Sequence, residues 1–443
     1  MATLLLWESV CLSEEEKFIK LYLNSPLENE SPSQETKSPI GKSLLDLINN
    51  AKNTIDFAVF GIRGQKVIQN ALFQAKKRGV RIRGVVDKDI KNRNYYWDTV
   101  PFIKKLGNVR TDYRHDKFMQ RKFSNAKRKA MSGCEAPQGF NGPPQCYMYF
   151  LPDGKPFQGV WASKQSLEFK GNLMHNKFFI VDNEYVWTGS ANFSDTCFEY
   201  NANNALLMHS SQAASWYEQE FEEMYLKGNF SRDKRVNQRG SNLFEKIDPD
   251  TTVSVYFSPQ GYPMWDGIEL AIKQAQKKID IAVFYLTHKY IVQDLMDAKK
   301  RGVRVRVIVD ATGASNEYSK HEAIRASGIP VKVENWGAKL HMKSAIIDDA
   351  IVILGSMNWT AAGEKNNDEN TLIIHNQELA KEYSLFYEKL WESIPEQWLE
   401  GRPEPESLDS MGSCSDGIDN DFDKLKDMKD PQCKVEVANN LNK

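Results

Sequence analysis

"MHNKFFIVDNEYVWTGSAN", from Met174 to Asn192, and "LHMKSAIIDDAIVILGSMN", from Leu340 to Asn358, carry the same ionisable residues at the same spacing. Each follows His-x-Lys-x-x-x-x-Asp and ends in Gly-Ser-x-Asn. Because residues i and i+2 of a strand point to the same face, the His and the Lys should lie side by side on an otherwise apolar strand. The Gly-Ser turn can bring a hydroxyl and a carboxamide to the end of that face. Each segment therefore predicts one cationic, hydrogen-bonding half-site.

The two segments belong to a longer internal repeat. NTIDFAVFGI at 53–62 is similar to KKIDIAVFYL at 277–286, and AKKRGVRIRGVVD at 75–87 is similar to AKKRGVRVRVIVD at 298–310. The continuous runs of Val and Ile are typical of strands buried on both faces, and the Lys/Arg cluster before a Gly is typical of a helix end. Each copy therefore predicts strand, helix, strand, and the alternation predicts an α/β fold with a mostly parallel sheet.

The repeat divides the chain into two lobes that should be related by a pseudo-twofold axis. The first copy is longer than the second between its second strand and its His motif, which predicts an insertion there. The predicted organisation is an N-terminal extension at 1–42, a first lobe at 43–227 with an insertion at about 112–170, a polar linker at 228–250, a second lobe at 251–395, and a linker with an acidic tail at 396–443.

Paired His and Lys side chains suit chemistry on a phosphodiester. Lys177 and Lys343 can offset the charge of the diester and stabilise a five-coordinate transition state. One neutral His can attack phosphorus and form a covalent phosphohistidine. The other His can protonate the leaving oxygen and then remove a proton from water. This scheme requires no metal ion.

The duplicated motif closely resembles the phospholipase D superfamily, over about residues 43–395. The resemblance implies two fused α/β lobes with the active site at their interface and no catalytic cofactor. In this superfamily the Asp of the motif, here Asp182 or Asp348, is mainly a structural hydrogen-bond partner. The half-site residues that it implies are His175, Lys177, Ser190 and Asn192 in the first lobe, and His341, Lys343, Ser356 and Asn358 in the second.

The resemblance also implies that a polar residue after each Gly-Ser turn backs a His. Fourteen residues beyond the Gly stand Glu369 in the second copy and Asn203 in the first. A carboxylate stabilises an imidazolium better than a carboxamide does. We therefore predict that Glu369 backs His341 as the general acid, and that Asn203 backs His175 as the nucleophile.

The substrate class stays open between nucleic acid and lipid. GSMNWTAAGEKNNDEN at 355–370 resembles the nuclease and cardiolipin-hydrolase branch of the superfamily, although two fused lobes depart from its small homodimeric nucleases. We favour a nuclease on DNA or RNA. A phospholipase D or cardiolipin hydrolase acting on phospholipid headgroups is the alternative, and a non-catalytic phosphate-binding module is a weaker hypothesis.

The predicted insertion contains a basic patch that is interleaved with Phe118 and Phe123. Basic residues with aromatics suit phosphate contact and base stacking. The same patch suits anionic lipid headgroups, and a solvated amphipathic helix is an equally good interpretation. The candidate substrate-binding residues are Lys117, Arg121, Lys122, Lys127, Arg128 and Lys129.

The acidic tail "CSDGIDNDFDKLKDMKDPQC", at 414–433, has Asp residues at spacings similar to positions 1, 3, 5, 9 and 12 of a calcium loop. Lys424 stands where an EF-hand needs Gly, and Asp430 where it needs Glu, so the tail is no ordinary EF-hand. It resembles the short Cys-bracketed calcium motifs of bacterial extracellular proteins, with a disordered acidic tail as the alternative. The candidate ligands of a structural Ca²⁺ are Asp419, Asp421, Asp423, Asp427 and Asp430.

Cysteines and composition bear on the compartment and on the partners. Cys134 and Cys146 bracket a Pro/Gly loop, and Cys414 and Cys433 bracket the acidic tail, which favours two local disulfides and a secreted or periplasmic protein. The first residues are a poor secretory signal, so the cytoplasm is the alternative. A net charge of −1 requires a local basic patch for any acidic partner. No apolar run approaches the ~20 residues of a membrane helix. Since the chain contains two complete motifs, we expect it to be active as a monomer.

Overall fold

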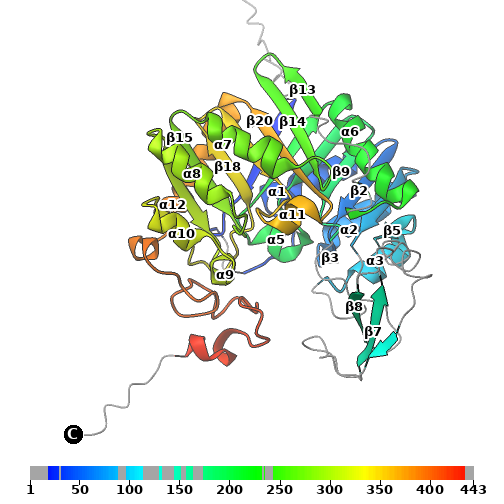
Figure 1. Ribbon diagram of the computed structural model, residues 1–443. Coiled ribbons are helices and arrows are strands. Elements are labelled where there is room, and N and C mark those ends of the chain that lie inside the picture. Colours follow the sequence, from blue (N-terminus) through cyan, green and yellow to red (C-terminus); the bar gives the residue numbers. More distant parts are fainter. Residues whose placement is uncertain are drawn as a thin grey trace, which may run out of the picture.

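A computed structural model of the chain describes residues 18–28, 31–87, 96–112, 129–131, 144–150, 156–162, 173–231, 234 and 243–434. Two large sheets form its body, one in each lobe (Figure 1). The first has the order β1 (Ile19–Asn24), β12 (Asn203–His209), β10 (Tyr185–Gly189), β9 (Lys177–Val181), β2 (Thr54–Val59), β4 (Arg81–Val86), β5 (Val109–Thr111). The second has the order β13 (Leu243–Asp248), β14 (Thr251–Ser258), β20 (Glu369–His375), β19 (Ile351–Gly355), β18 (Lys343–Ile347), β15 (Lys278–Val283), β16 (Arg304–Val309), β17 (Val331–Val333).

The predicted two-lobed α/β fold is confirmed, but both sheets are mixed, so the expectation of mostly parallel strands is wrong in this detail. Parallel pairs occur only along β2–β4–β5 and β15–β16–β17 of the two described sheets. The reason is a tight turn inside each His motif. Asp182 and Asn183 have φ of 54° and 57°, and Asp348 and Asp349 have φ of 56° and 52°. Two consecutive positive φ values are typical of a type I′ hairpin turn, which makes β9–β10 and β18–β19 antiparallel.

Helices cover the sheets and also lie between them. The first lobe contains α1 (Pro39–Asn50), α2 (Lys66–Lys77), α3 (Thr99–Leu106), α5 (Asp195–Glu199) and α6 (Ser211–Glu222), which continues as the π-helical turn η1 (Glu223–Lys227). The second contains the π-helical turn η3 (Pro263–Ile268) with α7 (Glu269–Gln274), α8 (Ile291–Lys300), α9 (Ala311–Ser315), α10 (His321–Ala326), α11 (Ala361–Lys365), α12 (Gln377–Ser393) and the 3₁₀ turn η4 (Glu396–Leu399).

One hydrophobic core is shared by the two lobes. It contains Phe178 of β9 and Tyr217 of α6 from the first lobe, together with Ile346 of β18 and Tyr383 of α12 from the second, all at most 1% exposed. Two further cores lie within single lobes. The capping side chains of Ser210 and Asn376 start α6 and α12, the helices that fill this shared core. The interface that carries the half-sites is therefore part of the protein interior.

Several segments depart from the predicted domain plan. β1 stands in the predicted extension and β13 in the predicted linker, yet each is the edge strand of a sheet. The predicted insertion contains β6 (Lys129–Met131), β7 (Pro144–Phe150) and β8 (Pro156–Ala162), a separate antiparallel sheet that projects from the body at the lower right of Figure 1. Lys129 starts β6, and the other five residues of the basic patch, Lys117, Arg121, Lys122, Lys127 and Arg128, lie outside the described residues.

The predicted disulfide between Cys414 and Cys433 is confirmed. Cys11 and Cys134 lie outside the described residues, so the second predicted bridge stays a prediction. Cys197 is buried and forms no disulfide with any described cysteine. Within the described ranges, the helices are too short or too polar to cross a lipid bilayer.

Two pairs of backbone hydrogen bonds join the lobes next to the His motifs. The His175 N–H donates to the Asp368 carbonyl at 2.9 Å, and the Asp368 N–H donates to the Leu173 carbonyl at 2.8 Å. In the same way the His341 N–H donates to the Ala202 carbonyl at 2.9 Å, and the Ala202 N–H donates to the Lys339 carbonyl at 2.9 Å. Each lobe thus holds the other lobe's His segment in a short parallel β-bridge.

The linker is fixed at this junction by Lys234. Its side chain is 1% exposed, and its ammonium group lies between the carboxylates of Glu220 and Asp368, 2.7 Å from the Asp368 Oδ1. Asp368 is the residue whose backbone bridges to His175. A buried ion triad therefore ties α6, the linker and the second lobe together.

Replacing Lys234 by Met should leave two buried carboxylates without their cation. We expect the free energy of unfolding to fall by about 3 kcal/mol, the usual cost of removing one member of a buried ion pair. Urea denaturation followed by circular dichroism measures this loss. The exposed Lys246→Met variant is the matched control, and equal stability of the two variants would contradict the structural role of Lys234.

Candidate active site

The two predicted half-sites meet at the interface between the lobes. His175 and His341 are 6% and 8% exposed, and Lys177 and Lys343 are each 1% exposed. The two lysine ammonium groups lie close enough to lower the pKa of both imidazoles. Four groups that can carry positive charge thus share one buried space, which matches a phosphodiester in charge.

Glu369 backs His175 and not His341, so the predicted pairing is wrong. The Nδ1 of His175 lies 2.9 Å and 2.8 Å from the two carboxylate oxygens of Glu369. Glu369 is itself fully buried and is held by the Ser356 hydroxyl at 2.7 Å and the Asn367 amide at 3.0 Å. The carboxylate therefore fixes the His175 ring so that Nε2 faces away from the Glu.

Asn203 correspondingly backs His341. The Nδ1 of His341 lies 3.2 Å from Asn203 Oδ1 and 3.0 Å from the carbonyl oxygen of Ser190. Ser190 also donates its hydroxyl to Asn203 Oδ1 at 2.7 Å. The physical reason for the exchange is the pair of β-bridges, since these place Asp368-Glu369 beside His175 and Ala202-Asn203 beside His341. The sequence of one copy of the repeat does not reveal this exchange, because the contacts cross from one lobe to the other.

Each lysine is fixed by its own His. Lys177 Nζ donates to the His175 carbonyl at 2.7 Å, and Lys343 Nζ donates to the His341 carbonyl at 2.5 Å. Burial, the largest cause, lowers the pKa of Lys177 to about 8, and burial together with the nearby Lys177 lowers the pKa of Lys343 well below its usual value. The bound anion of a diester would restore the charge of both groups.

Burial also sets the ionisation of the other groups. Burial first, and then the two lysines, lower the pKa of His175 and of His341 well below 6.5. Both shifts favour the neutral form of the imidazole before substrate enters. Burial raises the pKa of Glu369 to about 7, although Lys177 opposes this shift.

Each half-site has a phenylalanine as one of its walls, and the sequence analysis missed both of these residues. The Phe60 ring packs edge-on against His175 at 4.9 Å, and the Phe284 ring packs against His341 at 5.1 Å. Lys177 and Lys343 lie over the same rings at 5.8 Å and 5.1 Å. The signal was present, because both residues follow the repeated IDxAV strand.

Asn192 and Asn358 each have a buried side-chain oxygen, Oδ1, that accepts no hydrogen bond from the described residues. A buried carboxamide without a partner is costly, and such atoms often await a ligand. Their predicted place beside the His and Lys groups gives each half-site a carboxamide for a phosphoryl group.

Asp182 and Asp348 lie at the far ends of β9 and β18, about 16 Å along the strand from the lysines. The carboxylate of Asp182 accepts from the backbone N–H groups of residues 52, 53 and 54 at 2.6–2.8 Å. The carboxylate of Asp348 accepts from those of residues 276, 277 and 278 at 2.7–2.9 Å. Both therefore hold the hairpin turns against the neighbouring strand, as the resemblance implies, and neither belongs with the reacting groups.

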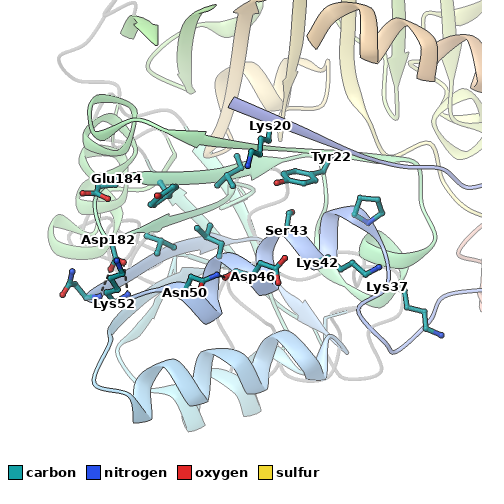
Figure 2. A pocket seen from close by; sticks show the side chains of 16 residues that line it. Lys20, Tyr22, Lys37, Lys42, Ser43, Asp46, Asn50, Lys52, Asp182 and Glu184 are labelled. Carbon is teal, nitrogen blue, oxygen red and sulfur yellow. Dashed lines mark hydrogen bonds between the residues drawn. The ribbon is translucent and has the colours of Figure 1, made fainter. Parts of the chain in front are cut away.

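A groove of about 1010 Å³ lies at this far end of β9, between α1, β1 and the β9–β10 hairpin (Figure 2). Lys20, Lys42 and Lys52 line it, but so do Asp46 and Glu184. Charges of both signs leave no basic surface for a phosphate. The groove is separate from the His–Lys site, which lies at the opposite end of β9, where Lys177 starts the strand.

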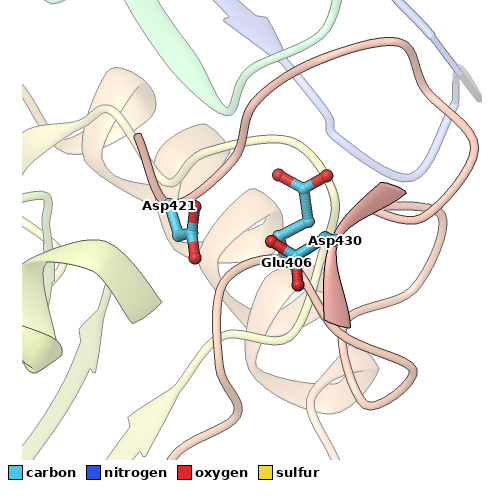
Figure 3. A group of neighbouring side chains, drawn as sticks. All are labelled: Glu406, Asp421 and Asp430. Carbon is cyan, nitrogen blue, oxygen red and sulfur yellow. The ribbon is translucent and has the colours of Figure 1, made fainter. Parts of the chain in front are cut away.

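The acidic tail gathers carboxylates from a wider set than the predicted one. Glu406, Asp421 and Asp430 offer oxygens that lie within 4.8 Å of one another (Figure 3), and Asp419, Asp421 and Asp423 form a second group of this kind. Asp427 belongs to neither group. Its carboxylate instead accepts from the Gly417 N–H at 3.0 Å. Sequence spacing missed Glu406, because it precedes the Cys-bracketed loop.

Comparisons with known proteins agree with this geometry. A family model described as "Cardiolipin synthase, PLD-like domain" matches residues 44–225 and 268–391. The mitochondrial cardiolipin hydrolase of Xenopus tropicalis is 30% identical over 138 residues, which are 31% of this chain and 66% of that protein. The phospholipase D of Rickettsia conorii is 36% identical over 112 residues, 25% of this chain and 56% of that protein.

The chain thus spans less than two thirds of the length of these curated relatives. The crystal structure of phosphatidylserine synthase from Haemophilus influenzae has the same fold, with a TM-score of 0.53, 14% identity, and coverage of 85% of this chain and 86% of that one. Together with two complete His-x-Lys-x-x-x-x-Asp motifs, the family match shows that this chain belongs to the PLD-like family of the phospholipase D superfamily.

Proposed function

We propose that this protein is a phosphodiesterase that works through a covalent phosphohistidine and needs no metal for catalysis. One observation carries the proposal. Both imidazoles are fixed at Nδ1 by an acceptor from the opposite lobe, which leaves both Nε2 atoms available beside two buried lysines. A nucleophile, a proton donor and charge stabilisation are thus present in the side chains.

In the first step, Nε2 of His175 attacks phosphorus. A P–N bond forms and the bond from phosphorus to the leaving oxygen breaks. His341, which is protonated at Nε2 once the substrate anion is bound, gives that proton to the leaving oxygen. Attack makes the His175 ring cationic, and the carboxylate of Glu369 at Nδ1 stabilises that charge. His341 has only the neutral acceptors Asn203 and Ser190, so its imidazolium releases a proton more readily. Glu369 backs His175 and not His341, but the predicted roles of His175 as nucleophile and His341 as general acid are still supported. The reason is now the charge that His175 gains when it attacks.

In the second step, water replaces the leaving group. His341, now neutral, takes a proton from the water, the oxygen attacks phosphorus, and the P–N bond breaks to regenerate His175. Lys177 and Lys343 stabilise the added charge in both steps. The catalytic set is therefore His175, Lys177, His341, Lys343 and Glu369, with Asn192 and Asn358 placed for the phosphoryl oxygens and Ser190 and Ser356 positioning the residues that back the histidines.

A nucleic-acid substrate is favoured by exposed aromatics with cationic neighbours close to both half-sites. In the first lobe, Trp97 is 53% exposed and stacks with the Arg63 guanidinium at 4.2 Å. Its neighbour Tyr96 packs on Phe60, the ring that contacts His175. Bases of a single strand stack on such surfaces while cations meet the backbone.

The second lobe has a similar surface. Trp265 and Tyr290 are 40% and 39% exposed, their rings are 4.9 Å apart, and Lys289 lies over Tyr290 at 4.5 Å. The segment is tied to the active site by its backbone, since the His288 N–H donates to the carbonyl of Trp359, the residue after Asn358. Aromatic surfaces therefore stand near both half-sites, as a strand that passes through the site requires.

Phospholipid is the second candidate substrate, and the names of the relatives favour it. A phospholipid headgroup is also attached through a phosphodiester, so the same His–Lys groups can act on it. The basic patch of the insertion, Lys117 to Lys129, would then contact anionic headgroups.

We further propose that the tail holds a structural Ca²⁺, that the protein acts outside the cytoplasm and that it is active as a monomer. Clustered carboxylate oxygens suit a hard cation, and calcium near millimolar concentration is typical of extracellular sites. The disulfide between Cys414 and Cys433 supports an oxidising compartment. Both half-sites come from one chain, so a second copy is not needed to complete the site.

The covalent step predicts different fates for the two His variants. In excess EDTA, the wild type should cleave ³²P-labelled single-stranded DNA. His175→Ala should form no labelled protein, while His341→Ala should retain label because its second step lacks the base. The control is His375→Ala, an exposed His that should behave as the wild type does. Label on His175→Ala would reverse the roles, and cleavage of anionic phospholipid vesicles alone would favour the lipid substrate.

The stacking surface predicts a change in KM without a change in kcat. Trp265→Ala should raise KM for single-stranded DNA about 5- to 150-fold, because stacking contributes about 1–3 kcal/mol per base. Leu385→Ala, which removes a side chain of α12 that is 69% exposed, is the control. An unchanged KM for DNA in Trp265→Ala would contradict a role for this surface in strand binding.

The titration of Glu369 should produce the acid limb of the pH profile of kcat. The pKa of Glu369 is raised to about 7, so the carboxylate is lost as pH falls through 7 and kcat should fall with it. Glu369→Gln should lower kcat about 10²- to 10⁴-fold, because an amide can select the wrong His175 tautomer, and should remove this limb. Glu364→Gln changes a carboxyl that is equally buried and has a pKa of about 7, and it should keep the limb. A limb that persists in Glu369→Gln belongs to another group.

A further inference from the structure

The C-terminal segment is packed directly against the loop that leads from β17 to His341. Met411 pairs with the backbone around Trp336, where the Gly337 N–H donates to the Met411 carbonyl at 2.7 Å and the Met411 N–H donates to the Asn335 carbonyl at 2.7 Å. Figure 1 shows this segment beneath α9 and α10, on the second lobe. The tail is therefore part of the folded body up to its disulfide.

Two contacts reach the residues next to the catalytic groups. The Asn420 carbonyl accepts from the Lys339 ammonium and from the Thr312 hydroxyl at 3.3 Å. Asp416 Oδ2 accepts from the buried Tyr200 hydroxyl at 3.2 Å. Lys339 stands two residues before His341, and Tyr200 stands three residues before Asn203. The tail thus touches both the segment that carries His341 and the segment that carries its acceptor.

These two segments are the partners in one of the bridges between the lobes. Lys339 donates its N–H to Asn201 Oδ1 at 3.0 Å and accepts from the Ala202 N–H at 2.9 Å. The next bond of the ladder runs from the His341 N–H to the Ala202 carbonyl. Anything that fixes Lys339 and Tyr200 therefore fixes the distance between His341 and Asn203. The corresponding bridge at His175 is held by Lys234 instead.

The carboxylates of the tail sit behind Asn420. Glu406 and Asp430 have no exposed surface, and Asp430 Oδ2 has no hydrogen-bond partner in the described residues. Asp421 completes the group and is the next residue after Asn420. Glu406 Oε2 accepts from the Asn420 N–H at 2.6 Å, so a ligand on Glu406 acts on the Asn420 peptide directly. Three carboxylates this close repel one another unless a cation or a proton neutralises them, and a set of oxygen ligands alone suits Ca²⁺.

We propose that a calcium ion held by Glu406, Asp421 and Asp430 locks the Asn420 turn onto Lys339 and thereby positions His341 for proton transfer. The ion touches neither the substrate nor the reacting atoms, and Glu406, Lys339 and Asn420 are positioning residues. The proposal rests on the proposed phosphodiesterase function. Since His341 acts in both steps, calcium should raise kcat and leave KM almost unchanged.

The experiment follows calcium through binding, backbone order and turnover in the full chain. After EDTA treatment and removal of the chelator, CaCl₂ is titrated calorimetrically. Hydrogen exchange is measured at the Ala202 and His341 amides without substrate. Calcium should bind, slow exchange at both amides at least about tenfold, and raise kcat about 3- to 10-fold. Asp430→Asn should lose all three effects. Asp409→Asn, which changes an exposed acid outside both carboxylate groups, should keep them.

Lys339→Met separates binding from coupling. It should bind calcium as the wild type does but show neither slower exchange at His341 nor a higher kcat. No binding of CaCl₂ to the wild type overturns the proposal, and so does binding that leaves both amides and kcat unchanged. Slower exchange in a protein that cleaves no diester supports the coupling and overturns the proposed function instead. If Asp430→Asn loses its far-ultraviolet circular dichroism signal, it is replaced by Asp421→Asn, which removes a different calcium ligand.

Discussion

The exchange of β-bridges between the lobes is the constraint on which the rest of the site depends. Each His segment pairs with backbone of the opposite lobe before its own strand begins, so neither imidazole is positioned by one lobe alone. The bridges also carry Glu369 and Asn203 to the His residues that they back. The position of each imidazole and the acceptor at its Nδ1 therefore follow from four backbone hydrogen bonds.

A substrate anion would favour the charged forms of the four buried nitrogen groups at the site. Two lysines and two imidazoles share a buried space with one carboxyl, and burial lowers the pKa of all four nitrogen groups. A phosphodiester that enters this space brings the negative charge that the protein lacks. Its binding should therefore draw protons onto the lysines and onto His341, which prepares the general acid in the complex that needs it.

The sequence was sufficient for what depends on local pattern, and insufficient for what depends on contacts across the interface. The repeated motif identified the two lobes and the half-site residues, and the two cysteines that bracket the acidic tail identified the disulfide between Cys414 and Cys433. The motif did not reveal that Glu369 serves His175, since both copies of the repeat place a polar residue at that position and only the bridges decide which ring it meets. Glu406 was missed for a similar reason, because it joins the tail carboxylates in space and not in spacing. The antiparallel hairpins were foreseeable, as Asp-Asn and Asp-Asp between apolar runs favour tight turns.

Joining the two lobes in one chain has a consequence for how such a site can diverge. Two identical subunits would offer both histidines the same acceptor, and their roles would be interchangeable until a substrate chose between them. Here the positions that correspond by the repeat hold Glu369 in one copy and Asn203 in the other. A single chain can therefore give each imidazole a different acceptor, a carboxylate for His175 and a carboxamide for His341. The two rings differ in their surroundings before any substrate binds, as distinct roles in the proposed reaction would require.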